Sequence, residues 1–277
     1  FNILQTACIN PVKHYKLPVG LLNPGDPADF ILVKDLVHFE VSSTYINGEL
    51  VAEHGISNIK SVATNAINNF NCEKIEPTAL AIPANEYPNK NGIIPVIEAL
   101  DGQLITNKLL LTGTLQNGNW VTDTTNDILK IVVVNRYHPA PIAKAFIKNF
   151  GLTHGAIASS VAHDSHNIVA VGVNDESIAA AINLVIEAGG GVSVVNDGNN
   201  NATNLVLPLP VAGLMSAADG FEVASTYTAI DLAAKALGSK LEAPFMTLSF
   251  MALLVIPHLK LSDKGLFNGD DFNFDIF

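Results

Sequence analysis

The feature that most constrains the fold is a series of short apolar runs, separated by polar or glycine-rich turns, from residue 128 onward. Each run is too short for a core helix, and several are rich in valine and isoleucine, which is typical of buried strands. Between two of these runs the sequence predicts a helix that is capped by Asn174 and ends at Gly189. Alternating strands and helices predict a layered α/β (α+β) domain with a mixed sheet. The predicted strands are residues 128–134, 156–162, 168–173, 192–195 and 205–209.

Further elements follow from turn and capping signals. Asp101-Gly102 is a hairpin signal between apolar runs at residues 93–100 and 104–111. Pro139 is suited to a first helical turn, so we expect a helix with an apolar face over residues 142–150. Two more helices are expected over residues 221–237 and 244–254. We expect His258 and Asp263 at the capped end of the last one.

The first part of the chain has a different pattern. Residues 17–55 hold short apolar runs around an Asn47-Gly48 hairpin signal, which predicts a small β unit that is too small to fold alone. Residues 61–91 are rich in Asn, Pro, Glu and Ala without clear periodicity, and we interpret them as connecting structure. The predicted domains are therefore residues 1–60 and 61–277, with residues 61–91 connecting them.

Charge and hydropathy exclude several partners. The net charge is −11 with 15 Lys and Arg, so nucleic acid and anionic membranes are not expected partners. The longest apolar stretch, residues 245–256, is shorter than a membrane-spanning helix and argues against a membrane protein. Cys8 and Cys72 cannot form a disulfide framework, which fits a reducing cytoplasm, and both are expected to be small buried residues. Asn201 begins a glycosylation pattern that we expect to stay unmodified.

A cluster of ionisable and polar residues interrupts the apolar pattern. It consists of His163, Asp164, Ser165, His166 and Asn167, and the runs on both sides are those of buried strands. Such groups are costly to bury, so a role is expected for them. Three interpretations remain open: His163 and His166 as ligands of a divalent metal, a role facing a substrate or a domain interface, and a purely structural polar network.

Two further residues lie at a strand end. Arg136 and His138 follow the strand predicted over residues 128–134. Ligands bind at strand ends in α/β sheets, so both residues could line the same crevice as the histidine cluster. Ser159 and Ser160 lack the glycine-flanked elbow that a serine nucleophile needs, and we interpret them as small packing residues. The sequence thus assigns no catalytic residue.

Several segments resemble known families. Asn10-Pro11, residues 22–30 (LNPGDPADF) and residues 45–48 (YING) resemble the closing segment of amidohydrolases. This resemblance implies that a small β-sandwich segment precedes the α/β domain. The later segments are more specific and are similar to the C-terminal domain of prokaryotic adenine deaminases. They are residues 155–167 (GAIASSVAHDSHN), 207–216 (LPLPVAGLMS), 244–250 (PFMTLSF) and 259–266 (LKLSDKGL).

The resemblance implies a hydrolase of purine salvage that acts on a small purine, adenine, and forms hypoxanthine and ammonia. In that family a divalent metal (Mn, Fe or Zn) held in a catalytic barrel activates the attacking water. This chain has no His-x-His on a strand, and His14, His38, His54 and His138 are scattered. We therefore expect the barrel to lie upstream of Phe1 or to be missing, and the chain to be inactive alone. A cytoplasmic homo-oligomer is expected.

An alternative from a different class stays open. The domain could be a non-catalytic structural, oligomerisation or small-molecule-binding module, in which the histidine cluster only holds a turn. A role at the substrate mouth requires the cluster to face an open concave surface. A structural role allows the cluster to be enclosed by its own domain.

Overall fold

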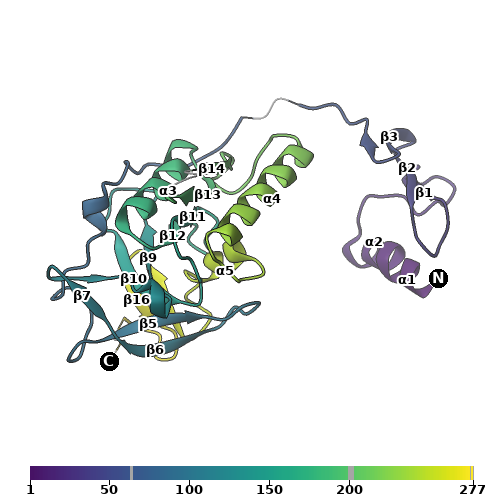
Figure 1. The fold of residues 1–277 in the computed structure, drawn as a ribbon. Helices are drawn as coiled ribbons and strands as arrows, with labels where there is room; N and C mark the ends of the chain where they lie inside the picture. Colours follow the sequence, from purple (N-terminus) through teal and green to yellow (C-terminus); the bar gives the residue numbers. More distant parts are fainter. Residues whose placement is uncertain (63–64, 199–202, 275, 277) are drawn as a thin grey trace. The chain divides into compact units, whose positions relative to one another are not determined.

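The computed structural model describes residues 1–62, 65–198, 203–274 and 276. The chain divides into two compact units, Phe1–Thr64 and Asn65–Phe277 (Figure 1). Asn201, where the glycosylation pattern begins, lies outside the described residues. None of the described helices is long and apolar enough to cross a membrane.

The first unit combines a helical start with a small sheet. The sheet is antiparallel, and its strand order follows the sequence. Asn47 and Gly48 have positive φ angles and join two of its strands, which confirms the predicted turn. The helical start was not predicted, and it leaves Cys8 exposed instead of buried. The elements are α1 (Asn2–Leu4), a π-helical stretch (Gln5–Ile9), α2 (Asn10–Tyr15), β1 (Phe30–Val33), β2 (Val41–Ile46), β3 (Glu49–Glu53) and β4 (Ile56–Ser57).

The second unit is built on a mixed sheet, which confirms the predicted fold class. Within the described residues the sheet has eight strands in the order β14-β13-β11-β12-β9-β10-β5-β6. Neighbouring strands are antiparallel except β5 and β10, which are parallel. The strands are β5 (Ile93–Ala99), β6 (Thr106–Thr112), β9 (Ile128–Val134), β10 (Ala143–Lys148), β11 (Ala156–Ser159), β12 (Ile168–Gly172), β13 (Gly191–Asn196) and β14 (Thr203–Pro208).

Both faces of this sheet are covered, as Figure 1 shows. Val132 and Val134 of β9 belong to the core that packs against α3, whereas Ile131 and Val133 belong to the core on the other face. That second core includes residues of α4, α5 and the β15–β16 hairpin. Alternate residues of a buried strand face opposite layers, which explains the uninterrupted apolar runs in the sequence. The covering elements are α3 (Asp175–Glu187), α4 (Gly220–Ala236), α5 (Pro244–Phe250), β15 (Leu259–Ser262) and β16 (Gly265–Asn268).

Short elements complete the unit at its margins. A two-stranded sheet pairs β7 with β8, and single 3₁₀ turns precede β5 and β9. Asn174 caps α3 through its side-chain oxygen, which accepts a hydrogen bond from the Ser177 N–H, as the sequence predicted. These margin elements are the 3₁₀ turns Pro77–Leu80 and Thr124–Asn126, and the strands β7 (Thr114–Gln116) and β8 (Asn119–Val121).

The helix predicted over residues 142–150 is wrong, because this segment forms β10. The strand lies between β9 and β5, where Phe146 pairs with Lys130 on one side and Val96 on the other. Pro139 lies in the connection before the strand and starts no helix. Ala143, Ala145, Phe146 and Ile147 are all buried, and pairing on both edges supplies the backbone partners that a helix would have supplied internally.

The end of the chain also differs from the prediction. The helix expected over residues 244–254 stops at Phe250, and His258 and Asp263 do not cap it. They instead flank the first strand of the β15–β16 hairpin, whose turn contains Asp263 and Lys264. Thr106 of β6 holds this hairpin, since its hydroxyl donates to the Leu259 carbonyl at 2.8 Å and accepts from the Leu259 N–H at 3.2 Å. These tertiary bonds hold a strand where the sequence predicted only the capped end of a helix.

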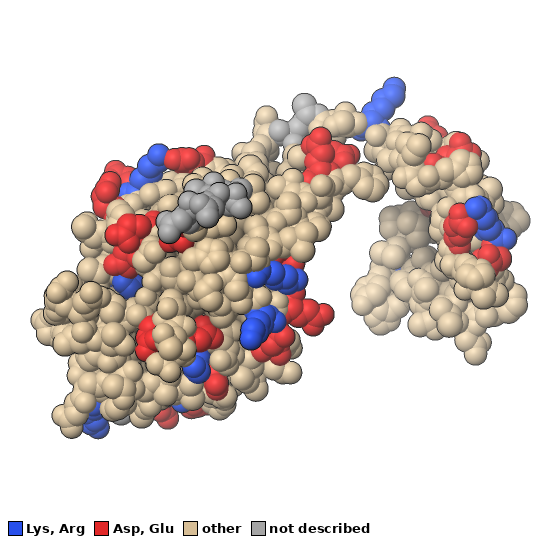
Figure 2. Space-filling view, in the orientation of Figure 1, with Lys and Arg blue, Asp and Glu red and all other residues tan. Residues whose placement is uncertain are grey.

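Positive and negative side chains are mixed on the face of the molecule that Figure 2 shows. On the face shown in Figure 2, the Lys and Arg side chains of the described residues lie among Asp and Glu side chains and form no basic patch.

Candidate functional site

Most of the residues singled out by the sequence gather at one edge of the large sheet. Val134 at the end of β9 pairs with Ile168 at the start of β12, and Ser159 at the end of β11 pairs with Val169 of β12 and Val192 of β13. The connection after β9 (residues 135–142) and the connection after β11 (residues 160–167) therefore leave the sheet at the same edge. We call residues 160–167 the histidine loop.

The imidazoles of the histidine loop pack against the domain. The His163 ring lies 5.0 Å from the Phe250 ring and 5.8 Å from the His166 ring, measured between centroids. The His163 N–H donates to the Ser249 carbonyl at 3.0 Å, and the His166 N–H donates to the Ala162 carbonyl at 2.6 Å. Both rings are partly buried. The loop is thus fixed to α5 by a ring contact and a backbone hydrogen bond.

His166 is an electrostatically unusual group. Its Nδ1 atom is buried and has no hydrogen-bond partner among the described residues. Burial lowers the pKa of His166 below its usual range, nearby His163 and Arg136 lower it further, and Asp164 opposes them. The environment therefore favours a neutral ring. A neutral imidazole can exchange a proton or bind a metal, whereas an imidazolium cannot serve as a ligand.

Arg136 fixes the histidine loop through buried hydrogen bonds. It is the chain's single arginine and is 3% exposed. Its Nε–H donates to the His166 carbonyl at 2.6 Å, and its backbone N–H donates to the Asn167 side-chain oxygen at 3.3 Å. The rest of the guanidinium donates to the side-chain oxygen of Asn68, the carbonyl oxygens of Asn69 and Ala212, and the hydroxyl of Tyr137. Because its donors are occupied, Arg136 positions the loop and has no free donor for a substrate.

Asp164 and Ser165, unlike the two imidazoles, face a cavity at the surface. Both are exposed and line a cavity of about 570 Å³ together with Asp263, Lys264 and several apolar side chains. We call this space the Asp164 cavity. The histidine cluster is therefore divided: its carboxylate and hydroxyl face a concave surface, whereas its imidazoles and Asn167 turn toward the domain.

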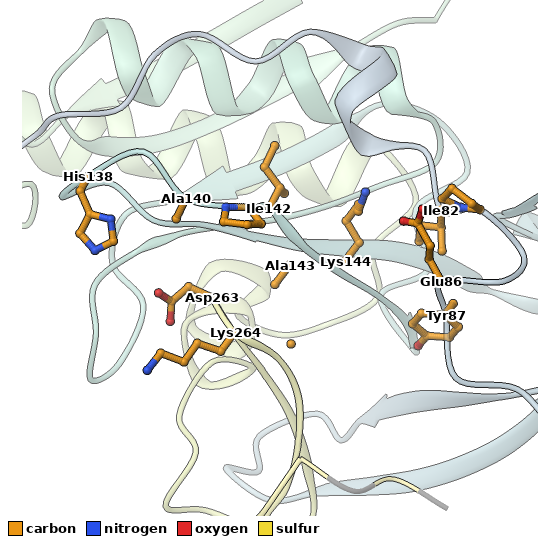
Figure 3. A pocket seen from close by; sticks show the side chains of 13 residues that line it. Ile82, Glu86, Tyr87, His138, Ala140, Ile142, Ala143, Lys144, Asp263 and Lys264 are labelled. Carbon is orange, nitrogen blue, oxygen red and sulfur yellow. The ribbon is translucent and has the colours of Figure 1, made fainter.

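His138 lines a second opening, which shares Asp263 and Lys264 with the Asp164 cavity. It lines a cleft of about 630 Å³, which we call the His138 cleft, between residues 82–87, residues 138–144 and residues 263–265 (Figure 3). Asn135 is 8% exposed and joins the two sides: its amide nitrogen donates to Asp263 at 2.9 Å and lies 3.4 Å from His138 Nε2. The structure thus places His138 beside a different opening from the one that Asp164 lines.

Sequence reasoning missed Asn135 and assigned Asp263 to a helix end. The two residues are distant in sequence, and only the β15–β16 hairpin brings them together. Asn135 lies next to the predicted Arg136 at the same strand end, which is the signal that could have included it.

Two serines, Ser160 at the start of the histidine loop and Ser159 just before it, are structural. The Ser160 hydroxyl donates to the Gly213 carbonyl at 2.6 Å and accepts from the Gly191 N–H at 2.8 Å. Ser159 accepts from the Val161 N–H at 2.9 Å. Both serines are almost fully buried. Asp197 is engaged with Gly155, Asn174 and Ser177, at the end of β11 away from the histidine loop.

The described residues do not form a metal centre. Nowhere among them do three His, Cys, Asp or Glu side chains gather closely enough to hold a metal ion. The prediction that His163 and His166 bind a metal would therefore need a further ligand from outside these residues.

The fold and this sheet edge define the class of protein: an α/β domain with a mixed sheet, covered on both faces, that presents a fixed polar loop beside open cavities. The chain belongs to the adenine deaminase C-terminal domain family, whose model matches residues 103–273. Residues 1–51 match the amidohydrolase family. Both matches agree with the resemblance seen in the sequence.

Individual relatives support the same assignment. The chain is 52% identical over 280 residues to an adenine deaminase of Methanosarcina acetivorans, covering 99% of this chain and 50% of the relative. It is 48% identical over 276 residues to an adenine deaminase of Borreliella burgdorferi, with 99% and 49% covered. For Salinibacter ruber the identity is 49%, with the same coverage. The chain spans about half the length of the curated relatives it matches.

Proposed function

We propose that this chain is part of an adenine deaminase, which hydrolyses adenine to hypoxanthine and ammonia. Water replaces the exocyclic amino group of the purine, and the nitrogen leaves as ammonia. The supporting observation is the match of residues 103–273 to the adenine deaminase C-terminal domain. Relatives called adenine deaminase, 48% and 52% identical in sequence to this chain, support it as well. The protein acts on a small purine in the cytoplasm, in purine salvage, as a homo-oligomer.

The metal of this activity belongs elsewhere in the proposed enzyme. The amidohydrolase match suggests a metal-dependent enzyme, but the described residues contain no set of ligands that fits a metal. We assign the divalent metal (Mn, Fe or Zn) to a catalytic barrel that this chain does not supply. The two predicted domains, residues 1–60 and 61–277 with a connection at 61–91, then form the closing segment of the amidohydrolase part and the accessory domain.

The histidine loop is proposed to lie at the substrate mouth. Asp164 and Ser165 are the residues that reach a concave surface, and His163, His166, Asn167 and Arg136 fix the loop that carries them. His138 borders the neighbouring opening. In this role the loop orients or encloses a substrate and forms no covalent bond with it.

A structural module is the second candidate. The imidazoles turn inward, with His163 against Phe250, and Arg136 donates to the backbone of the loop. Both contacts are what a loop that only maintains the fold would need. The two candidates differ in whether Asp164 and Ser165 affect turnover.

The test uses the complete protein that contains this sequence, loaded with Mn²⁺. We expect it to release ammonia from adenine, and the isolated 277-residue chain to release none above background. Asp164→Asn and Ser165→Ala in the complete protein are expected to lower kcat/KM about tenfold, with an unchanged unfolding midpoint. Glu222→Gln on α4 is the matched control, because Glu222 is exposed and distant from both cavities in sequence. Unchanged kinetics in both loop variants would support the structural module.

Metal binding by the loop needs a separate measurement. Elemental analysis of the purified chain, with His163→Ala beside it, distinguishes the metal interpretation from the other two. A stoichiometric metal that disappears in the variant supports ligation by His163. A metal-free chain removes this interpretation and leaves the deaminase proposal unaffected.

A further inference from the structure

The His138 cleft has the size and shape of a small-molecule site. Its volume of about 630 Å³ lies within the range of roughly 300–1,000 Å³ that is usual for ligand pockets. Three separate segments form its walls: residues 82–87, the start of β10 with the residues before it, and the turn at Asp263. Figure 3 shows His138, Asp263 and Lys264 together at one end, and Glu86 and Lys144 toward the other.

Asn135 preorganises the polar end of the cleft. Its side-chain oxygen accepts from the N–H groups of Tyr137 and His138 at 2.9 and 3.2 Å, which fixes the orientation of the amide. The two amide hydrogens then face Asp263 Oδ2 and His138 Nε2. The second carboxylate oxygen of Asp263, Oδ1, has no hydrogen bond within the described part of the chain. One strong acceptor is therefore held in place and left available.

The charges of the cleft favour a ligand that donates hydrogen bonds. The ammonium group of Lys144 is occupied, because it donates to the carbonyl oxygens of Ala79 and Ala81 at 3.3 and 2.7 Å. The carboxylate of Glu86 has neither an ion pair nor a hydrogen bond among the described residues. Lys264 carries the remaining positive charge and is exposed at the rim. The available groups inside the cleft are thus mainly acceptors.

The walls between the two ends are apolar. Ala143 is buried between the ends, and Pro141 and Ile142 complete this surface. The buried side chains of Ile82 and Tyr87 add apolar surface at the end that holds Glu86. An aromatic ring can bury its faces there without leaving a polar group unpaired. The cleft therefore combines an apolar slot with a carboxylate acceptor at its end.

We propose that the His138 cleft is a binding site for a flat aromatic amine or amidine. An N–H group of the ligand donates to Asp263 Oδ1, and the ring packs against the wall that contains Pro141 and Ile142. Hydrogen bonds from a cationic amidine to a carboxylate are charge-assisted and roughly twice as strong as neutral ones. The inference does not rest on the deaminase proposal, because it uses only the donors and acceptors of the cleft.

Benzamidine and benzoate provide a matched pair of probes. Both carry one ring and one planar substituent, but benzamidine donates and is cationic, whereas benzoate accepts and is anionic. Titration of the 277-residue chain by calorimetry or ligand-observed NMR at pH 7.5 is expected to give a Kd of about 1 mM for benzamidine. Benzoate is expected to bind at least tenfold more weakly.

Two variants locate the site. Asp263→Asn is expected to weaken benzamidine binding roughly tenfold or more, because a charged hydrogen bond is lost. Ala140→Phe fills the cleft from an exposed position, so the fold is retained while binding is abolished. Glu222→Gln is the control and leaves binding unchanged. The proposal is overturned by absent benzamidine binding, by benzoate binding equally well, or by unchanged affinity in Asp263→Asn and Ala140→Phe.

Discussion

At the scale of single residues, Arg136 shows why the histidine loop has a defined shape. A buried guanidinium is costly unless its donors are satisfied, and here they are satisfied by oxygen atoms from three parts of the second unit. The acceptors are neutral, so the positive charge remains and lowers the pKa of nearby His166. One side chain thus sets both the geometry and the electrostatics of the loop.

This arrangement predicts how stability depends on pH. The usual pKa of histidine, 6.5, applies to the unfolded chain, and the folded pKa of His166 is lower. As the pH falls through 6.5, the unfolded chain takes up the proton first, so the free energy of unfolding decreases. Above that pH the contribution is fully present. Burial, His163 and Arg136 lower the pKa of His166, and Asp164 opposes them.

The measurement compares the wild type with His166→Asn by urea unfolding between pH 7.5 and pH 5.0. Asparagine tolerates the positive φ of 52° at this position, so the backbone is retained. The wild type is expected to lose more stability over this range than the variant. Equal losses would show that His166 does not titrate differently in the folded chain.

At the scale of elements, a buried ion pair connects β9 to the first turn of α3. The Lys130 ammonium donates to Asp175 and to the Leu80 carbonyl, and the Lys130 side chain is only 4% exposed. Burial lowers the pKa of Lys130, and Asp175 counteracts this effect. Removal of the carboxylate charge would leave a buried cation without its partner.

Asp175→Asn is therefore expected to lower the free energy of unfolding by about 2 to 3 kcal/mol. The matched control is Glu187→Gln, which breaks the exposed Lys74–Glu187 pair at the other end of α3 and is expected to cost less than about 1 kcal/mol. Chemical unfolding of both variants gives the comparison. A similar small loss in both would mean that the β9–α3 pair contributes no more than a surface pair.

The elements also show what the sequence could predict. The runs that became β9, β11, β12 and β13, and the capped helix α3, were predicted because their signals are local. Strand β10 was not, since the segment after Pro139 satisfies a helical pattern and only pairing with β5 and β9 makes it extended. For the candidate site, too, the sequence could indicate only the residues that lie close together in the chain. The histidine loop and Arg136 are local signals, whereas the Asn135–Asp263 contact depends on the final hairpin.

At the scale of the whole molecule, the second unit contains its own cores. The buried residues of both clusters, and the apolar side chains packed against them, all lie between residues 70 and 276. Residues 65–277 are therefore expected to fold alone, with a cooperative unfolding transition and a free energy within about 1 kcal/mol of that of the same unit in the full chain. Thermal and urea unfolding of the shortened chain test this. A broad, non-cooperative transition would show that the first unit completes the fold.

The mixed sheet has a kinetic consequence. The strands from β9 to β14 are connected through antiparallel neighbours and one short helix, so they can assemble from contacts between nearby segments. The β5–β6 hairpin reaches the sheet only through its parallel pairing with β10, where Val96 meets Phe146. Contacts between segments far apart in the chain form slowly. During synthesis the β5–β6 hairpin emerges before the rest of the large sheet. The edge of β5 therefore stays unpaired until β10 has been made.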